Sequence, residues 1–312
     1  MAAGQGAGMR ERRHQPGAEL GWAETWDFDF VAPAFGIGGW ASLTLLPNRR
    51  RAWYHAFVAG PDRQTVAVVD HEVPLPLSTL EIRTTGLWAD HICETPGEHW
   101  TIGLEAFGLG LDDAWEMYGA QRGDRVPLGF DLEWEATAPT LDRSATSYEQ
   151  ACEVSGEVLV GDEQLDLVGT GTRRHHWGVP TWWDRSSVAV FGAVDGTAID
   201  VERSLSEPAG GGPTSPGSTL DVAGDERDIE SAGGGQIRPL GFPPHDRPST
   251  TVLSIAEDER RWHARPLAVT PVEVEDPEGR RSRMPRALCA AATTTGAPGW
   301  IWVRWQAPVV DD

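Results

Sequence analysis

Alternating apolar and polar positions recur along this chain, most clearly in an aromatic-rich segment near its N-terminal end. Trp26, Phe28 and Phe30 fall on one face of an extended segment. Asp27 and Asp29 fall on the other face. Because successive side chains of a strand point to opposite faces, this period of two predicts a strand with an apolar inner face and an acidic outer face.

The same alternation returns over residues 128–135, where apolar residues alternate with Gly129 and three acidic residues. Other short apolar runs, separated by Gly- and Pro-containing turns, are also typical of strands. They cover residues 39–46, 52–58, 65–69, 78–83, 87–93, 100–107, 152–160, 164–168, 187–194, 198–204, 250–256, 262–275, 283–294 and 300–306. Many short strands joined by turns predict an all-β fold, either a sandwich or a barrel.

Helical patterning is scarce. Residues 111–119 are typical of one short helix, because Asp112 or Asp113 would stabilise its first turn. Residues 208–217 and 232–235 are rich in Gly, Pro, Ser and Thr, which indicates long surface loops.

Domain boundaries follow from where turn residues gather. The acidic, turn-rich stretch 137–146 separates two halves of similar strand content. We therefore expect a disordered tail over residues 1–18, an N-terminal β domain over 19–143 and a C-terminal β domain over 144–312.

Composition narrows the possible functions. The chain has 312 residues, 40% of them hydrophobic, and a net charge of −21. This acidic balance disfavours binding to nucleic acid or to an anionic membrane through bulk electrostatics. All 26 basic residues are Arg, so Schiff-base and P-loop lysine chemistry is excluded.

Cysteine spacing and hydropathy indicate a reduced, soluble protein. Cys93, Cys152 and Cys289 lie far apart without a CxxC pair, so we expect free thiols and neither a disulfide framework nor a zinc site. No apolar run reaches the roughly 18 residues that a membrane span needs, and no signal peptide is apparent. The expected location is cytoplasmic.

Residues 169–183 form the segment richest in candidate chemistry, with two Arg, two His and three Trp. A buried indole N–H needs an acceptor, and a buried guanidinium needs an anion or several acceptors. The segment therefore either lines a pocket or forms a polar network within an ordinary strand. Gly169 and Gly171, which permit close backbone approach, favour the pocket.

Strand geometry divides this segment into two faces. Arg173, His175 and Trp177 point one way. Arg174 and His176 point the other way. The two adjacent histidines therefore cannot easily bind one metal ion, and we expect neither a metal nor a cofactor.

A second constellation lies in the first half of the chain. Trp53 and His55 share one face of an expected strand, and Tyr54 lies on the opposite face. An inward-pointing Trp53 and His55 would line a cavity of the first domain. In the alternative interpretation, His55 is a half-buried histidine with its hydrogen bonds satisfied by neighbours.

Tryptophan is unusually abundant, with 15 Trp against 3 Tyr. A Trp-lined interior suits a flat or polyene hydrophobe, or a carbocation that an indole face stabilises by about 0.5–2 kcal/mol. The alternative is that these residues simply fill strand-rich cores. Neither a GxSxG elbow, nor an HExxH motif, nor a dinucleotide-binding or P-loop sequence is present.

Residues 169–178, together with Trp182, resemble the signature G-x-G-x-R-D-H-S-W-G-x-x-x-W of uncharacterised relatives of the carotenoid 1,2-hydratase and AttH-like family. Residues 299–306 resemble the closing strand of that group, and residues 26–30 its opening strand. The resemblance implies two lipocalin-like (calycin) antiparallel β-barrels packed side by side, with a ligand site in or between them.

Characterised relatives in this family include hydratases and cyclases that act on terpenoid or polyketide-derived hydrophobes. An acidic residue of the motif protonates an alkene in the hydratases. Arg174 stands at that acidic position here, and His176 stands at the Ser position. The resemblance therefore retains Arg173, His175 and Trp177 but loses the acid.

Two functions follow as hypotheses. The first is a lyase or isomerase that hydrates, cyclises or isomerises a hydrophobic small molecule, with His175 as proton donor or orienting group and with His176 and Arg174 beside it. The second is a non-catalytic carrier of such a ligand, which the missing acid favours. In both, the expected ligand-binding residues are Arg173, Trp177, Trp182, Trp183, Trp53, Tyr54 and His55.

Overall fold

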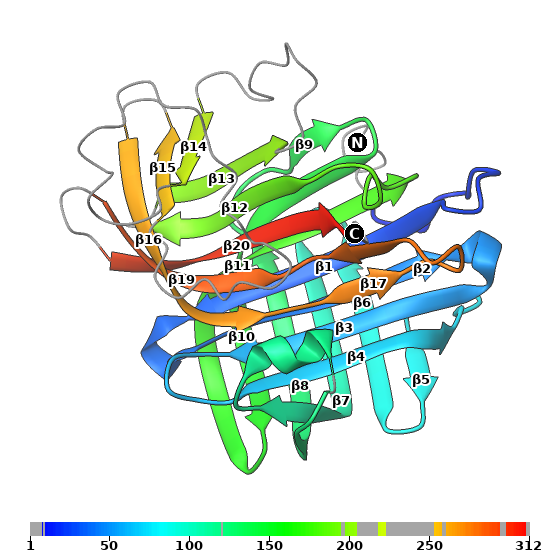
Figure 1. The fold of residues 1–312 in the computed structure, drawn as a ribbon, viewed down its shortest axis with the longest axis horizontal. Helices are drawn as coiled ribbons and strands as arrows, with labels where there is room; N and C mark the ends of the chain where they lie inside the picture. The colour runs from blue at the N-terminus through cyan, green and yellow to red at the C-terminus, as the bar shows by residue number, and fades with distance from the viewer. Residues whose placement is uncertain are drawn as a thin grey trace. The chain divides into compact units, whose positions relative to one another are not determined.

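The computed structural model describes residues 8, 10–119, 121–194, 197–204, 218–222, 253–257, 260–293 and 298–309. The regular structure of these residues is almost entirely antiparallel β-sheet (Figure 1), which confirms the predicted all-β class. The chain divides into two compact units. Unit 1 comprises Met1–Asp112 and Arg122–Pro180, and unit 2 comprises Asp113–Gln121 and Thr181–Asp312.

Unit 1 contains eleven strands that belong to one sheet. They are β1 (Ala23–Ala32), β2 (Ile37–Leu46), β3 (Arg51–Ala59), β4 (Thr65–Pro74), β5 (Ile82–Thr84), β6 (Leu87–Thr95), β7 (His99–Leu111), β8 (Asp124–Ala136), β9 (Leu141–Ser144), β10 (Ser147–Val160) and β11 (Glu163–Gly178). Two short 3-10 turns, η1 (Pro33–Phe35) and η2 (Pro47–Arg49), connect β1 to β2 and β2 to β3.

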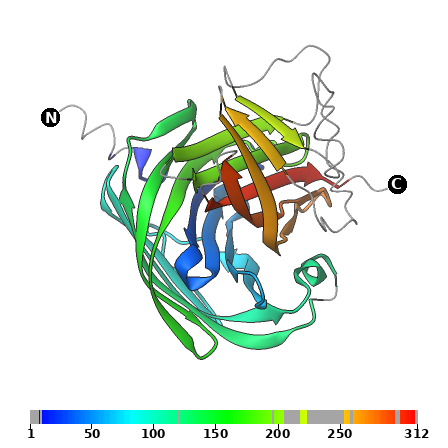
Figure 2. The same cartoon turned by 90° about the vertical axis from the view of Figure 1, so that its left-hand side faces the viewer.

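The strands of this sheet follow the order β4-β3-β2-β1-β11-β10-β8-β7-β6-β5. β9 pairs with β10, and a further antiparallel pairing joins β4 to β7. The pairing of β4 with β7 closes part of this order on itself. Eight strands therefore form a continuous ring of hydrogen-bonded neighbours, in the order β4-β3-β2-β1-β11-β10-β8-β7. Figure 2 shows the strands of unit 1 curving around a common interior.

The apolar face of β1 supplies part of the core of unit 1. Trp26, Phe28 and Phe30 are each at most 1% exposed and pack with apolar residues of the other strands. Trp134 of β8 belongs to the same core and donates its indole N–H to the carbonyl oxygen of Asp29 at 3.0 Å. We call the face that carries these side chains the interior of unit 1.

The two strands with the clearest alternation differ on their outer faces. In β8 the outer residues Asp131, Glu133 and Glu135 are exposed, as predicted. In β1 the expectation of an exposed acidic face is wrong, because Asp27 and Asp29 are 3% and 1% exposed. Alternation therefore identified both strands but not which outer face meets solvent.

Unit 2 begins with the 3-10 helix η3 (Ala114–Tyr118), whose first turn is capped by the Asp113 carboxylate accepting from the backbone N–H of Trp115. The short helix predicted over 111–119 is thus confirmed. The strands of unit 2 are β12 (Ser187–Val194), β13 (Thr197–Ser204), β14 (Ser218–Val222), β15 (Leu253–Glu257), β16 (Arg260–Thr270), β17 (Glu273–Glu275), β18 (Arg281–Arg283), β19 (Arg286–Thr293) and β20 (Pro298–Pro308).

The main sheet of unit 2 has the order β13-β12-β20-β19-β16-β15-β14, and β18 pairs with β17 and β20. Residues 262–275, predicted as one strand, are divided between β16 and β17, since Pro271 has no N–H to donate. The loops predicted over 208–217 and 232–235 lie outside the described residues.

The division into units differs from the predicted boundary between residues 143 and 144. β10 and β11 follow that boundary in sequence, yet β11 pairs with β1 over residues 170–178 and belongs to unit 1. The predicted tail over 1–18 differs as well, because Glu11 is only 5% exposed within unit 1. Both differences arise from long-range contacts that local turn composition does not encode.

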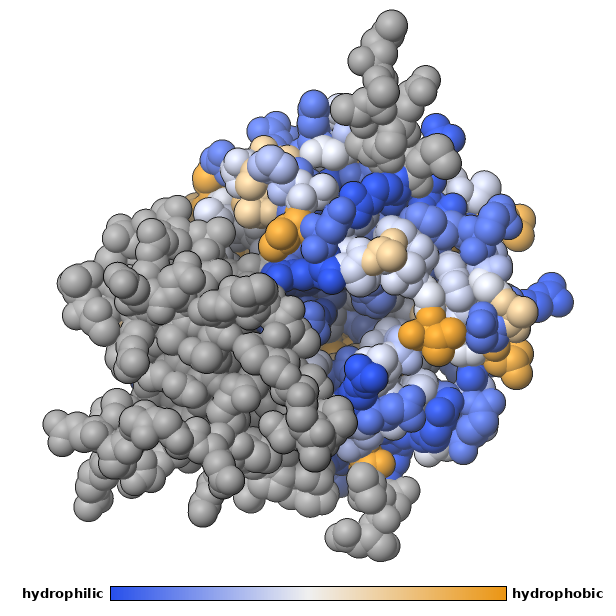
Figure 3. Space-filling model, turned by 90° about the horizontal axis from the view of Figure 1, so that it is seen from above, coloured by the Kyte–Doolittle hydropathy of each residue, from blue (hydrophilic) through white to orange (hydrophobic). Residues whose placement is uncertain are grey.

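The described surface is mostly hydrophilic. On the face shown in Figure 3, apolar residues are few and lie in small groups among hydrophilic ones where the surface is coloured. Leu77, Leu141 and Val168 are examples of exposed apolar side chains. Within the described part of the chain, no helix combines the length and apolarity that crossing a bilayer requires.

Candidate functional site

The motif of residues 169–178 lies on one long strand, β11, between β1 and β10. His175 is opposite Trp26 and Arg173 is opposite Phe28 in the register with β1, so both side chains face the interior of unit 1. Arg174 is opposite Asp27 on the other face. The predicted alternation along the motif is therefore confirmed.

Gly171 allows this close pairing. A Cβ atom at Gly171 would lie 2.0 Å from the carbonyl oxygen of Asp29, and at Gly169 it would lie 2.3 Å from that of Val31. Any side chain at either position would therefore push β11 away from β1. The glycines of the motif act on strand pairing, which places Arg173 and His175 on the interior.

Arg173 is held by a buried anion from the N-terminal segment. Its two terminal nitrogens donate to the two carboxylate oxygens of Glu11 at 3.0 and 2.7 Å, and its Nε donates to Oε1 of Gln150 at 2.8 Å. Tyr148 donates its hydroxyl to Glu11 at 2.5 Å, and the backbone N–H of Gly97 donates to the same carboxylate at 3.0 Å. Burial disfavours the charged guanidinium, but the charge of Glu11, its hydrogen bonds to Arg173, and the neighbouring Tyr148 and Cys152 together outweigh burial and raise the pKa of Arg173.

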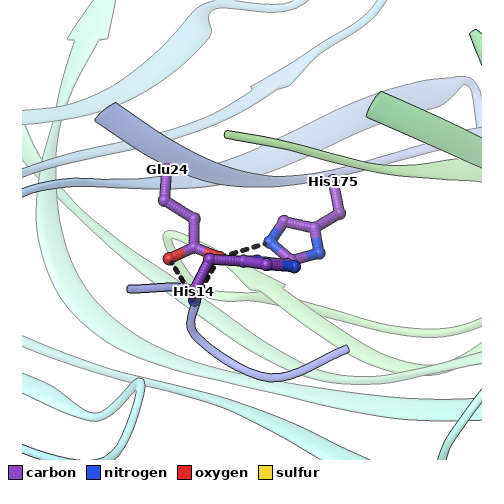
Figure 4. Close-up of side chains that lie close together, drawn as sticks. All are labelled: His14, Glu24 and His175. Atoms are coloured by element: carbon purple, nitrogen blue, oxygen red, sulfur yellow. Dashed lines mark hydrogen bonds and ion pairs between the residues drawn. The ribbon is translucent and has the colours of Figure 1, made fainter. Parts of the chain in front are cut away.

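His175 lies beside Glu24 and His14 (Figure 4). Its Nε2 is 2.9 Å from Oε1 of Glu24, and its Nδ1 is 2.9 Å from the carbonyl oxygen of Arg10. His14 approaches the same Oε1 with its Nδ1 at 2.7 Å and stacks its ring on Trp177 at 3.8 Å. We call Glu11, His14, Glu24, Arg173 and His175 the ion-paired cluster.

The contact between Nε2 of His175 and Oε1 of Glu24 requires one shared proton. A carbonyl oxygen can only accept, so Nδ1 of His175 carries a hydrogen toward Arg10. In the neutral ring, Nε2 then presents its lone pair to Glu24. The contact at 2.9 Å is favourable only if a proton lies between Nε2 and Oε1.

The electrostatics of the site assign this proton to Glu24. Burial raises the pKa of Glu24 to about 8, although the backbone N–H of His14 and the charge of Arg13 oppose the shift. Burial also lowers the pKa of His175 well below its ordinary value, assisted by the charges of His14 and His176. At neutral pH the pair is therefore a protonated carboxyl group donating to a neutral imidazole.

The donor atoms of His14, Glu24 and His175 all lie within 4.8 Å of one another, which is the donor set of a two-histidine, one-carboxylate metal site. The residues are the right types, and no sequence spacing indicated them. The charges around them oppose a cation, however, since Arg10, Arg13 and Arg173 each act on a member of the trio. A shared proton also explains why the donor atoms lie so close together, and it brings less positive charge than a divalent metal ion. We therefore interpret His14, Glu24 and His175 as a proton-sharing group.

A second set of interior polar groups has no such partners. The indole nitrogens of Trp26 and Trp100, the hydroxyl of Tyr54 and both ring nitrogens of His91 are buried without a hydrogen-bond partner among the described residues. Phe28 contacts two of these residues, with ring centroids 5.5 Å from His91 and 5.3 Å from Trp100. We call Trp26, Tyr54, His91 and Trp100 the unpaired cluster.

The two clusters share one interior. Trp26 stacks on His175 with ring centroids 4.4 Å apart, and the guanidinium of Arg173 lies 6.0 Å from the Trp100 ring. Burial lowers the pKa of His91 to about 3, so the unpaired cluster carries no formal charge at neutral pH. The interior of unit 1 thus joins an acid–base pair to a neutral polar region.

Arg174 occupies a different environment from the residues beside it. On the opposite face of β11 it pairs with the carboxylates of Asp27, at 3.3 Å, and Asp29. All three side chains are buried. Arg174 therefore pairs with both acids of β1, and it lies on the face opposite His175.

The expectation for β3 is reversed in the structure. Tyr54 points into the core of unit 1, whereas Trp53 and His55 lie on the outer face. His55 has its Nε2 at 2.8 Å from Nε2 of His71, and the ring of Trp53 lies 5.3 Å from that of His71. Tyr54, which was expected on the face away from the cavity, is therefore the residue of this group that faces the interior.

The remaining predicted site residues are dispersed. Trp182 and Trp183 belong to unit 2, where their rings meet edge to face at 6.0 Å and Trp183 faces Arg280. His176 shares the outer face with Arg174. Of the predicted set, only Arg173, His175, Trp177 and Tyr54 are brought together in the interior of unit 1.

Sequence reasoning missed Glu11, Glu24, His91 and Trp100. Glu24 precedes Trp26 by two positions, so the period of two already placed it on the same face as the aromatic residues. His91 and Trp100 lie on expected strands, but nothing local distinguishes their faces. Glu11 lies in a segment whose composition indicated a tail.

The outer face of unit 1 also carries a groove of about 780 Å³. It crosses β5, β6, β7, β8 and β10, where Arg83, Trp88, Glu105 and Gly129 form a row of paired positions. Phe107 and Leu159 add apolar surface, and Asp131 and Glu157 add acidic groups, so the lining of the groove is amphipathic. It lies on the face opposite the two clusters.

Residues 9–215 match the family described as Domain of unknown function (DUF7064). The chain belongs to the DUF7064 family. This match includes all of unit 1 from Arg10 onward, and with it both interior clusters.

Solved structures resemble this DUF7064 member in fold. A protein of Nitrosomonas europaea assigned as an AttH is 10% identical, with a TM-score of 0.51 and coverage of 96% of this chain and 98% of the other. CghA, solved with Sch210972, is also 10% identical, with a TM-score of 0.53 and coverage of 96% and 95%. At this identity the likeness shows the fold alone, and no functionally curated protein matches the sequence.

Proposed function

We propose that this DUF7064 protein binds a hydrophobic small molecule of terpenoid, polyketide or lipid type inside unit 1 and acts on it by acid–base chemistry. The observation that carries the proposal is the buried Glu24–His175 pair, which holds one proton between two acceptors. The likeness of the fold to AttH-type proteins and CghA supports a lipocalin-like barrel in unit 1, built from the ring of eight strands.

Glu24 takes the role of the acid that the family motif lacks at Arg174. A carboxyl group kept neutral at pH 7 by burial is a general acid of suitable strength. In a hydration, Glu24 gives its proton to one alkene carbon, water adds to the other, and the proton that the water loses returns to Glu24. In an isomerisation, the carbocation loses a proton from a neighbouring carbon to the same carboxylate.

The surroundings of the pair fit this chemistry. Trp26 stacks on His175 and presents an indole face near the acid, where it stabilises a developing positive charge by about 0.5–2 kcal/mol. His175, with its hydrogen directed to the Arg10 carbonyl, orients the proton and accepts it transiently. In this proposal His175 is a positioning partner, and the donor is Glu24.

The experiment compares wild type with Glu24→Gln, which keeps the shape of the side chain but cannot donate an acidic proton. Each protein is incubated with a panel of terpenoid alcohols and unsaturated fatty acids, and products are sought by mass spectrometry as isomers or as species heavier by one water. We expect product with wild type, loss of at least about a hundredfold in rate with Glu24→Gln, and full activity with the exposed Glu153→Gln control. Equal activity in Glu24→Gln would contradict the proposed acid.

A non-catalytic carrier is the second candidate. It is favoured by the arrangement of the ion-paired cluster, in which Glu24 and His175 are each 1% exposed and bonded to other protein groups. Quenching of tryptophan fluorescence by panel compounds, without any product, would identify the carrier.

A further inference from the structure

The unpaired cluster is the part of unit 1 that neither the fold nor the proposed acid explains. A buried polar group without a hydrogen bond costs roughly 1–3 kcal/mol, so a folded protein rarely retains several in one place. Tyr54 is 0% exposed and His91 is 3% exposed, and both ring nitrogens of His91 and the Tyr54 hydroxyl lack a partner among the described residues.

These groups come from different strands and face one region. Tyr54 lies on β3 and His91 on β6, with ring centroids 5.9 Å apart and planes inclined by 59°. The Trp100 ring of β7 packs against the same Phe28 ring that contacts His91, and its buried indole N–H has no partner among the described residues. The rings are close, yet no hydrogen bond joins Tyr54 to His91, so each hydroxyl or nitrogen has its hydrogen-bonding capacity available for a third group.

The chemistry of the three side chains defines that group. A phenol donates and accepts, a neutral imidazole offers one donor and one acceptor, and an indole only donates. Together they complement a neutral oxygen that accepts strongly and can also donate. A carboxylate is disfavoured, because none of the three carries a positive charge.

We propose that Tyr54 and His91, with Trp100, form a polar subsite that hydrogen-bonds a hydroxyl or carbonyl oxygen of an otherwise apolar ligand. The inference rests on the proposed function, since it specifies the ligand of the same interior. Phe28 and Trp26, on the wall between this subsite and His175, would contact the apolar part of the ligand. The subsite therefore orients the ligand relative to Glu24 by holding its oxygen.

The test uses two compounds with one carbon skeleton, geraniol and its deoxygenated hydrocarbon 2,6-dimethylocta-2,6-diene. Their dissociation constants are measured by tryptophan fluorescence for wild type, Tyr54→Phe and His91→Leu. We expect wild type to prefer geraniol by roughly tenfold, the equivalent of one good hydrogen bond. Each variant should reduce that preference to about twofold or less while leaving hydrocarbon affinity unchanged.

Matched controls separate the subsite from general effects. Tyr118→Phe makes the same chemical change at a tyrosine of unit 2 whose hydroxyl is buried, and His99→Leu makes the histidine change at a partly exposed position of β7. Both should retain the wild-type preference. Melting temperatures of the ligand-free proteins show that the variants are folded, and Tyr54→Phe should not melt lower than wild type, because its hydroxyl has no partner to lose among the described residues.

The outcomes separate the two proposals. Equal binding of both compounds to wild type, or an unchanged preference in Tyr54→Phe and His91→Leu, would overturn the subsite and assign these groups to buried water only. The proposed function would survive that result. Failure of both compounds to bind would overturn the binding function and the subsite with it.

Discussion

The ion-paired cluster and the unpaired cluster occupy one interior, yet they satisfy their polar atoms in opposite ways. Around Arg173 and His175 every hydrogen-bonding group named above has a protein partner within 3.0 Å. Around Tyr54 and His91 none has one among the described residues. Polar groups with all their hydrogen bonds made within the protein typically stabilise the fold. Buried polar groups without such partners are typical of sites that hydrogen-bond a ligand or water.

The structure also assigns different roles to two residues of the motif, Arg173 and His175, which the sequence alone did not distinguish. Arg173 and His175 are successive residues on one face of β11, but Arg173 serves a structural ion pair and His175 shares a proton. Four predictions, in order of decreasing effect, test this division.

Replacing Arg173 by Met should have the largest effect on stability. The variant leaves the Glu11 carboxylate buried without its bidentate partner, which costs about 3–5 kcal/mol of unfolding free energy. Urea unfolding at pH 7 measures the loss. The control Arg83→Met removes an exposed ion pair with Glu81 and should cost less than about 1 kcal/mol. A loss below that level for Arg173→Met would show that Glu11 is not held as described.

Glu24→Gln should change how stability depends on pH. The folded pKa of Glu24 is about 8, above the ordinary 4.5, so the folded state binds more protons than the unfolded state between these values. Its contribution is complete below pH 4.5 and is lost as pH rises through 8. The unfolding free energy of wild type should therefore fall as pH rises through this window, at a steepest slope of about 1.4 kcal/mol per pH, and the variant should lack that slope.

Urea titrations from about pH 4 to about pH 9 bracket this window, with Glu153→Gln as the matched exposed control. If wild type and Glu24→Gln follow parallel curves, the proton is not held at Glu24 in the folded state.

His91→Leu should act at the acid end of the pH range. The folded pKa of His91 is about 3, below the ordinary 6.5, so the unfolded state binds the extra proton between these values. Wild type therefore loses stability as pH falls from 6.5 toward 3, and His91→Leu should lose less. Thermal melts at about pH 7 and about pH 4.5 measure the difference. A variant as acid-sensitive as wild type would indicate that His91 is already charged or solvated.

Tyr54→Phe should have the smallest effect without ligand. Removing a hydroxyl that has no partner among the described residues should leave the unfolding free energy unchanged or raise it by up to about 1 kcal/mol. Tyr148→Phe, which loses the hydroxyl bonded to Glu11, should instead destabilise the protein by about 1–2 kcal/mol. If Tyr54→Phe destabilised the protein as much as Tyr148→Phe, the distinction between the two clusters would fail for this residue.

The sequence predicted the strands well and the site only in part. Period-two alternation identified β1 and β8 and divided the motif into two faces, because side-chain direction in a strand is a local property. It could not predict that the outer acids of β1 would be buried against Arg174, since their exposure depends on what covers that face. Tyr54 and Trp53 were assigned to the wrong faces for the same reason.

The partners of the motif were unpredictable for a different reason. The anion that pairs with Arg173 is Glu11, 162 residues away in the sequence. Glu24 was within reach of the pattern, two positions before Trp26, but its role depends on the register that brings it to His175. The family resemblance showed that Arg174 stands where relatives carry an acid. A motif on one strand contains no information about Glu24, which lies on another strand.

The pairing of β1 with β11 also determines when this protein can fold during synthesis. β1 gains β2 as a neighbour early, but its other edge stays open until the ribosome has released residues up to Gly178. Long-range pairings of this kind slow folding, and an open edge invites pairing with other chains. Asp27 and Asp29 lie on β1, where their charges discourage such contacts until Arg174 has been synthesised and pairs with them.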